Sequence, residues 1–125
     1  MDRYSEAQRP LYEVKANLFK GLSHPLRVRI LEVLSAAEEV PVADLLADTG
    51  LEASHLSQHL AVLRRHHLVS STRRGSLVYY RLTHPEIAEL LRVSRRLLGE
   101  VLRSTQEQLS STVDLPALPG DGAAS

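Results

Sequence analysis

Histidine is the residue type in this chain best suited to chemistry, because its imidazole binds divalent metals and changes charge near neutral pH. The chain has six histidines, and four of them fall within HLSQHLAVLRRHH at residues 55–67. His55 and His59 are four residues apart, a spacing at which two side chains on one helix can clamp a metal ion. His66 and His67 follow two arginines. The stretch is therefore either a metal site or a polar surface that uses histidine for another purpose.

The wider composition favours the polar surface. The absence of cysteine excludes disulfides and thiolate metal sites. The glutamate of HExxH hydrolases is missing from HLSQH, and two imidazoles alone make an incomplete zinc site. No glycine-rich phosphate loop and no nucleophile–base pair is recognisable either, so we do not expect an enzyme.

The elements that position these residues follow from apolar spacing. Leucine, valine and phenylalanine at helical intervals predict a helix over 11–22. Ser23 is expected to cap a second helix that has Pro25 in its first turn and ends near Ala37. Pro41 is expected to begin a short helix over 42–49, which Gly50 closes.

A helix-turn-helix with a wing is predicted next. After Gly50, Ser54 is expected to cap a helix that runs to about His66, so two helices flank a tight turn. Residues 68–72 and 77–82 alternate as strands around the turn Arg73-Arg74-Gly75-Ser76. Pro85 then begins a long helix that reaches Leu109. We therefore expect a mainly α winged helix-turn-helix, in the order α-α-α-α-β-β-α, over 11–112, with a flexible arm at 1–10 and a disordered tail at 113–125.

Three leucines orient the histidine-rich helix. Leu56, Leu60 and Leu63 fall within about 60° of arc and form its buried stripe. Ser54, Gln58 and Arg65 then face outward, whereas His55 and His59 lie on one flank, with His59 nearer the stripe. The four histidines therefore divide into two on an outward flank and two at the helix end, and we do not expect them to share one ion.

The charge distribution suggests what this face binds. The chain has 15 basic and 15 acidic residues, yet residues 54–81 contain five arginines and no carboxylate. An acid-free basic segment can present a DNA-binding face on a neutral protein, although chance clustering on a solvated surface is the alternative.

Three segments, in this order and spacing, resemble the ArsR/SmtB family of bacterial winged-helix repressors. They are LFKGLSHPLRVRILEVL (18–34), VADLLADTGLEASHLSQHLAVLRRHHLV (42–69) and STRRGSLVYYRL (71–82). The resemblance implies a homodimer that represses transcription from a dyad-symmetric DNA operator. A cytoplasmic location is expected separately, because MDRYSEAQRP lacks the apolar segment of a secretory signal. The DNA-binding residues that we expect are Ser54, His55, Ser57, Gln58, His59, Arg64, Arg65, Arg73, Arg74 and Gly75.

One departure from the family concerns the helix end. Many members have Ala-Gly where this chain has His66-His67. Glycine suits the left-handed conformation that ends a helix, and histidine tolerates it better than most residues. We therefore expect His67 to end the helix in that conformation.

A metal-sensing site would lie on the last helix. The family's last-helix metal site is represented by His84, Glu86 and Glu100, but Leu97 replaces a central histidine. A weak Ni²⁺ or Zn²⁺ site that includes a partner's Glu100 is one alternative, and an apolar interface with His84 as an ordinary helix-start residue is the favoured one.

The long last helix favours a homodimer independently, because it would be nearly 40 Å long at about 1.5 Å per residue, more than so small a core covers. A monomer with a mobile helix is the rival. A winged-helix subunit that acts through a protein co-regulator is the alternative function. No apolar run suits a membrane span, so no membrane partner is expected.

Overall fold

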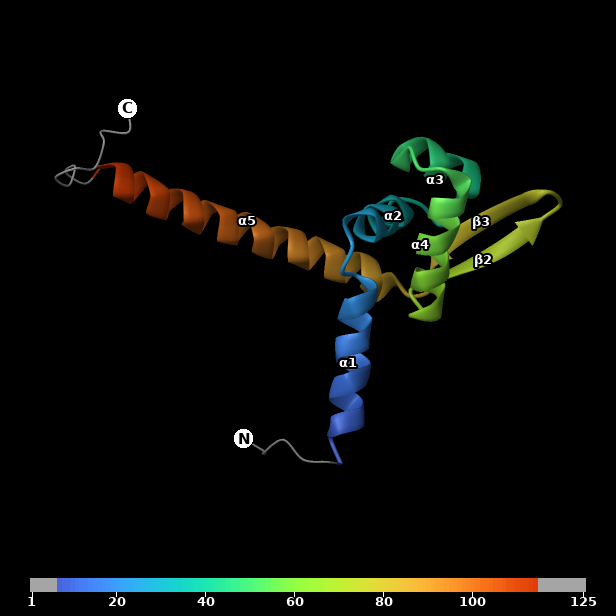
Figure 1. Ribbon diagram of the computed structural model, residues 1–125, viewed down its shortest axis with the longest axis horizontal. Helices are drawn as coiled ribbons and strands as arrows, with labels where there is room; N and C mark the ends of the chain where they lie inside the picture. Colours follow the sequence, from blue (N-terminus) through green and yellow to red (C-terminus); the bar gives the residue numbers. More distant parts are fainter. Residues whose placement is uncertain (1–6, 115–125) are drawn as a thin grey trace. The chain divides into compact units, whose positions relative to one another are not determined.

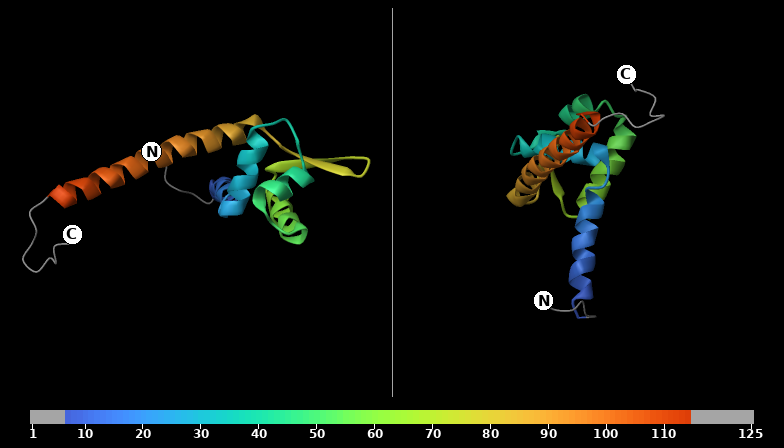
Figure 2. Two further views of the ribbon diagram at one scale, coloured as in Figure 1. Left: turned by 90° about the horizontal axis from the view of Figure 1, so that it is seen from above. Right: turned by 90° about the vertical axis from the view of Figure 1, so that its left-hand side faces the viewer.

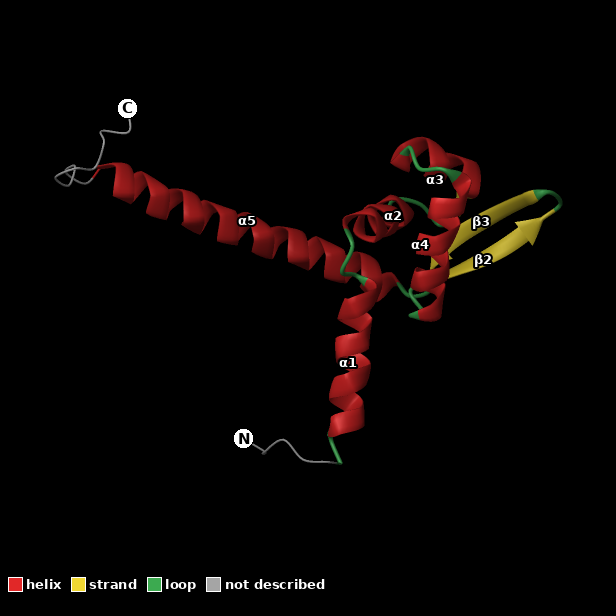
Figure 3. Cartoon of the chain, viewed as in Figure 1, coloured by secondary structure: helices red, strands yellow, loops and turns green. Residues whose placement is uncertain are grey.

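The computed structural model describes residues 7–114, and these follow the expected order of elements with one short strand added (Figure 1). The helices are α1 (Arg9–Gly21), α2 (Pro25–Ser35), α3 (Val42–Thr49), α4 (Ala53–Arg65) and α5 (Pro85–Asp114). The strands are β1 (Val40–Pro41), β2 (Val69–Arg74) and β3 (Leu77–Leu82). Figure 3 shows the dominance of helix, and the predicted mainly helical winged helix-turn-helix class is confirmed.

Contacts divide the chain into two units, Met1–Glu89 and Leu90–Ser125. The first unit contains α1–α4, the sheet and the first turn of α5, and the second contains the rest of α5. The expected arm and tail lie mostly outside the described residues, although α1 already begins at Arg9 and α5 continues past Leu109 to Asp114. No helix in the described range 7–114 has the length and apolarity that crossing a membrane requires.

Leucines on α2, α3 and α4 build the core of the first unit. Leu56, Leu60 and Leu63 are at most 3% exposed, which confirms the predicted buried stripe of α4. The same burial is found for Ile30, Leu31 and Leu34 of α2 and for Leu45 of α3. The sheet contributes the buried side chains of Val69 and Tyr80 to this core. Each such side chain stabilises the folded state by about 1.5–3 kcal/mol relative to exposure. The core therefore fixes which side of α4 faces outward.

The helix-turn-helix turn depends on one glycine. Gly50 has φ +68° and donates its N–H to the carbonyl of Leu46 at 2.9 Å. This left-handed closure ends α3 where the sequence predicted, and α4 begins three residues later. A bidentate ion pair between Arg29 and Asp48, with N–O distances of 2.8 and 2.6 Å, further ties α2 to the end of α3.

The sheet has three antiparallel strands in the order β1-β3-β2. Arg74 pairs with Leu77, so the strands of the hairpin extend to a two-residue turn at Gly75, which has φ +64°. Figures 1 and 2 show this hairpin projecting from the helices as a wing. Sequence reasoning missed β1, because two residues are too few for alternation and Pro41 favoured a helix start.

Two predicted caps are wrong. His24, rather than Ser23, caps α2, and its ring nitrogen Nδ1 accepts the N–H of Leu26 at 3.1 Å. Glu52 holds the N-cap position of α4 without a side-chain cap bond, so Ser54 lies inside the helix. In both cases a serine beside the boundary matched the usual preference, but the start of the helix is set by the turn that precedes it.

Candidate nucleic-acid interface

The outward face of α4 is polar and uncovered. Ser54, His55, Ser57, Gln58 and Arg65 are all exposed, as the buried leucines require. Its small side chains let another surface approach closely, and its serine, glutamine and histidine groups can donate and accept hydrogen bonds. An exposed helix with this chemistry suits the edges of base pairs in a major groove.

His59 is held differently from its neighbours. It is half-buried, and its ring centroid lies 4.4 Å from that of His24 at a tilt of 52°. Burial lowers the pKa of His59, and the positive charges of His24, Arg27 and His55 lower it further. His59 therefore links α4 to the cap of α2, and it is less available to an outside partner than His55. Sequence reasoning placed His59 nearer the buried stripe but did not identify His24 as its neighbour.

Two arginines end α4, and they have different surroundings. Arg64 is exposed and reaches the hydroxyl of Tyr80 on β3 at 3.5 Å. Arg65 is exposed and lines a pocket beside α1 together with His66 and His67. Both guanidinium groups remain near the surface, where they can meet a phosphate.

The wing presents one arginine and anchors another. Arg74 forms an ion pair with Glu39, which precedes β1, and its guanidinium lies 4.1 Å above the ring of Tyr79. These contacts brace the hairpin, and the ion pair raises the pKa of Arg74. Arg73 is exposed beside the exposed turn residue Gly75. We therefore regard Arg73 as the residue of this pair better placed to meet a ligand.

The end of α4 confirms one prediction about His67. Its φ is +60°, the one positive value among the non-glycine residues described. Its carbonyl accepts the hydroxyl of Thr83 at 2.7 Å, which ties the helix end to the end of β3. His66 forms the C-cap, and its ring lies against Gly21, where a Cβ atom would come within 2.9 Å of it.

The metal candidates remain predictions. His84 contacts Thr83 through Nδ1 at 3.1 Å, and Glu100 forms an ion pair with Arg103. Within residues 7–114, no group of three histidine or carboxylate side chains is placed to hold an ion.

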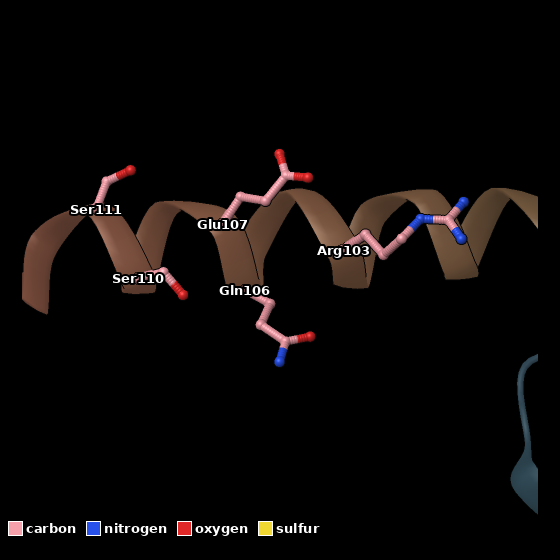
Figure 4. Close-up of a pocket in the computed structure, with 5 residues that line it drawn as sticks. All are labelled: Arg103, Gln106, Glu107, Ser110 and Ser111. Atoms are coloured by element: carbon pink, nitrogen blue, oxygen red, sulfur yellow. The ribbon is translucent and has the colours of Figure 1, made fainter.

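A shallow depression on α5 offers no site. Its lining residues are Arg103, Gln106, Glu107, Ser110 and Ser111. Figure 4 shows these side chains leaving a single helix in different directions, without converging on one point. They form an ordinary solvated helix surface.

Comparison with known proteins gives one consistent result. The family model for the "Bacterial regulatory protein, arsR family" matches residues 24–71, which span α2, α3, α4 and the start of the wing. Rv0081, an uncharacterized HTH-type transcriptional regulator of Mycobacterium tuberculosis, is 48% identical over 93 residues, covering 74% of this chain and 82% of the relative. Its crystal structure superimposes with a TM-score of 0.72, covering 77% of this chain and 96% of that one.

Two further solved structures are similar. Mb0332 of Mycobacterium bovis, described as a homodimeric winged helix-turn-helix DNA-binding domain, is 27% identical with a TM-score of 0.70, covering 80% of this chain and 92% of that one. The transcriptional repressor BigR of Xylella fastidiosa is 32% identical with a TM-score of 0.65, covering 76% and 96%.

Proposed function

The chain belongs to the ArsR family of bacterial regulatory proteins, and we propose that it is a repressor that binds a dyad-symmetric operator as a homodimer. Members of this family are DNA-binding transcriptional regulators and not enzymes. What we propose beyond family membership is binding to a dyad-symmetric operator, assembly as a homodimer and action in the cytoplasm.

The observation that carries the proposal is the exposed face of α4. Three buried leucines hold that face outward, and residues 54–81, which include it and the wing, contain no carboxylate. In such a helix the N-terminal residues lie nearest the bases. Ser54, Ser57 and Gln58 would therefore read base edges, because amide and hydroxyl groups can pair with the donors and acceptors of the major groove.

Arginines flank that face and would supply the electrostatic attraction. Arg64 and Arg65 at the end of α4 and Arg73 in the wing are exposed, so they can neutralise backbone phosphates and release counterions. These contacts would position the protein on DNA without reading its sequence.

The dimer is supported by apolar surface that the chain leaves uncovered. On α5, Val93, Leu97, Leu98, Val101, Leu102 and Leu109 are 44–67% exposed, and on α1, Leu11, Val14 and Phe19 are 56–68% exposed. Exposed apolar rows of this length mark protein interfaces. The homodimeric description of the similar protein Mb0332 makes a second copy the favoured partner. Two copies would place two recognition helices about one DNA turn apart.

Titration onto DNA tests the proposal. The purified chain is added to its own upstream DNA and to a scrambled duplex of equal composition at several salt concentrations, with fluorescence anisotropy as the readout. We expect preference for the upstream DNA, binding in the nanomolar range and a steep salt dependence. Equal affinity for the two duplexes would contradict the repressor and favour the alternative, a subunit that acts through a protein partner.

Gln58 provides the finer test of base reading. Gln58→Ala should change the ranking of operator variants, because a base-reading side chain contributes only at its own base pair. A uniform loss over all sequences would contradict the assignment.

A further inference from the structure

A pocket of about 440 Å³ lies in the first unit, beside the end of α4. Its walls come from α1, from the loop between α4 and β2, and from the start of α5. Leu18, Leu68 and Ile87 contribute apolar wall, and its volume is within the range of about 300–1,000 Å³ typical of small-molecule sites.

The charged side chains that line this pocket have one sign. They are Lys15 and Arg65, and no carboxylate occurs among the described residues that line it. His66, His67, His84 and Asn17 add polar groups without a fixed charge. The whole chain has as many acidic as basic residues, so this selection is not the average of its surface. Cationic groups around an apolar wall suit a ligand that has an anionic group on an apolar body.

Two backbone features accommodate the paired histidines. His67 occupies the left-handed region with φ +60°, a conformation that is strained for residues other than glycine. Gly21 is buried with no room for a Cβ atom, because the His66 ring lies there. Glycine at position 67 would relieve the strain without changing the fold. Position 67 therefore has a histidine beside the pocket where glycine would meet the backbone requirement at lower cost.

A short hydrogen-bonded chain orients the third histidine. The Thr83 hydroxyl donates to the His67 carbonyl at 2.7 Å. His84 Nδ1 lies 3.1 Å from the hydroxyl oxygen of Thr83. Because the hydroxyl has a single proton, His84 Nδ1 must donate to it. His84 is thereby held in one orientation at the pocket wall, and Nε2 is its ring nitrogen that this contact leaves unused.

We propose that this pocket is an effector site for a small organic carboxylate with an aryl or short alkyl body. Leu11 and Val14 on its rim belong to the exposed apolar face of α1. A ligand there would act at the edge of the proposed dimer interface, so its influence on DNA binding rests on the proposed function. The binding of the ligand itself does not rest on the proposed function, so ligand binding and its effect on DNA binding are measured separately.

Calorimetry with the full chain and no DNA tests the binding. The probes are benzoate and hexanoate, with benzamide and hexanamide as neutral counterparts of equal shape. We expect saturable binding of a carboxylate at one site per chain and affinity about tenfold lower for its amide, as loss of a charge-assisted hydrogen bond implies. Equal affinity of an acid and its amide would overturn the proposal. Absence of binding by both acids would also overturn it, and that result is expected if a second copy of the chain fills the pocket.

Variants locate the site. His67→Gly and Lys15→Gln should each weaken carboxylate binding about tenfold. Lys20→Gln, which removes an exposed cation of α1 outside the pocket, should leave it unchanged. His67→Gly cannot fail merely by misfolding, because glycine favours the conformation of that residue. Equal loss in the Lys20 variant would overturn the proposal, as would Zn²⁺ or Ni²⁺ binding that His67→Gly abolishes while no carboxylate binds.

Discussion

The helices α4 and α5 both carry a stripe of leucines, and the chain completes the packing of only one of them. Leu56, Leu60 and Leu63 on α4 are at most 3% exposed, whereas Leu97, Leu98 and Leu102 on α5 are 58–67% exposed. The second helix is 30 residues long, roughly 45 Å. The same residue type therefore stabilises the fold in one region and remains available for assembly in the other. This difference predicts that substitutions of equivalent leucines should have opposite consequences for folding and assembly.

The largest expected effect concerns assembly. Leu98→Glu combined with Leu102→Glu should leave the monomer folded, because both positions are solvent-exposed in it. In a dimer, each leucine that is fully buried contributes about 1.5–3 kcal/mol, and four are lost. We expect the dissociation constant to rise at least about a thousandfold, measured by sedimentation equilibrium.

Arg96→Glu provides the control for that experiment. Arg96 is exposed on the side of α5 opposite the leucine stripe. It should keep the wild-type association, and equal dissociation in both variants would show that charge, not the apolar stripe, governs assembly. A wild-type chain that stays monomeric at high concentration would show that the exposed leucines of α5 do not serve assembly.

The next effect concerns folding. Leu63→Ala should destabilise the chain by about 2–5 kcal/mol, because it leaves a cavity among α4 and its neighbours. Denaturant titration of this substitution in the Leu98→Glu, Leu102→Glu background removes the contribution of assembly. Leu97→Ala in the same background should change stability by less than about 0.5 kcal/mol. Similar losses from the two alanines would contradict the division between the regions.

A smaller effect separates the two wing arginines. Arg73→Ala should weaken binding to every DNA sequence and reduce the slope of log affinity against log salt by about one, as expected for one lost phosphate contact. Glu39→Gln should strengthen binding, because it releases Arg74 from its ion pair. Anisotropy at several salt concentrations measures both. Unchanged affinity for Glu39→Gln would show that Arg74 does not reach DNA even when it is released from Glu39.

The smallest effect is the pH dependence that His59 contributes. The pKa of His59 is lowered in the folded chain, whereas in the unfolded chain it has its usual value of about 6.5. Between these two pKa values, unfolding is accompanied by uptake of a proton. The free energy of unfolding should therefore fall as the pH drops from about 6.5 toward the lowered pKa, and above about pH 6.5 His59 should cause no such loss. Thermal unfolding across this interval should have a shallower pH dependence in His59→Gln. An unchanged dependence would show that this histidine is not its source.

Much of the fold could be predicted from local pattern. Apolar spacing identified α2 and the buried side of α4, and Pro41 and Gly50 delimited α3. Gly50 and Gly75 marked the two turns at which glycine has a positive φ. The conformation of His67 followed from the position of a helix end. These features depend on residues near each other in the sequence, where helical and turn preferences act directly.

The remaining features depend on contacts between distant segments. β1 exists because Val40 pairs with Tyr80, and His59 is half-buried because His24 lies beside it. The ion pair of Arg74 with Glu39 likewise joins residues 35 positions apart. Periodicity contains no information on such pairs, so sequence reasoning assigned Arg74 and His59 to the DNA-binding surface without identifying Glu39 and His24 as the residues that they contact.

Spacing of the operator half-sites tests the central claim most directly, because it requires both the outward face of α4 and a dimer. Once a footprint defines two half-sites in the upstream DNA, duplexes are made with about 5 or about 10 base pairs inserted between them. The account predicts that about half a turn sharply weakens binding by rotating one half-site away, and that a full turn disturbs it less. Equal affinity for all three duplexes would contradict a dimer that reads two half-sites at once.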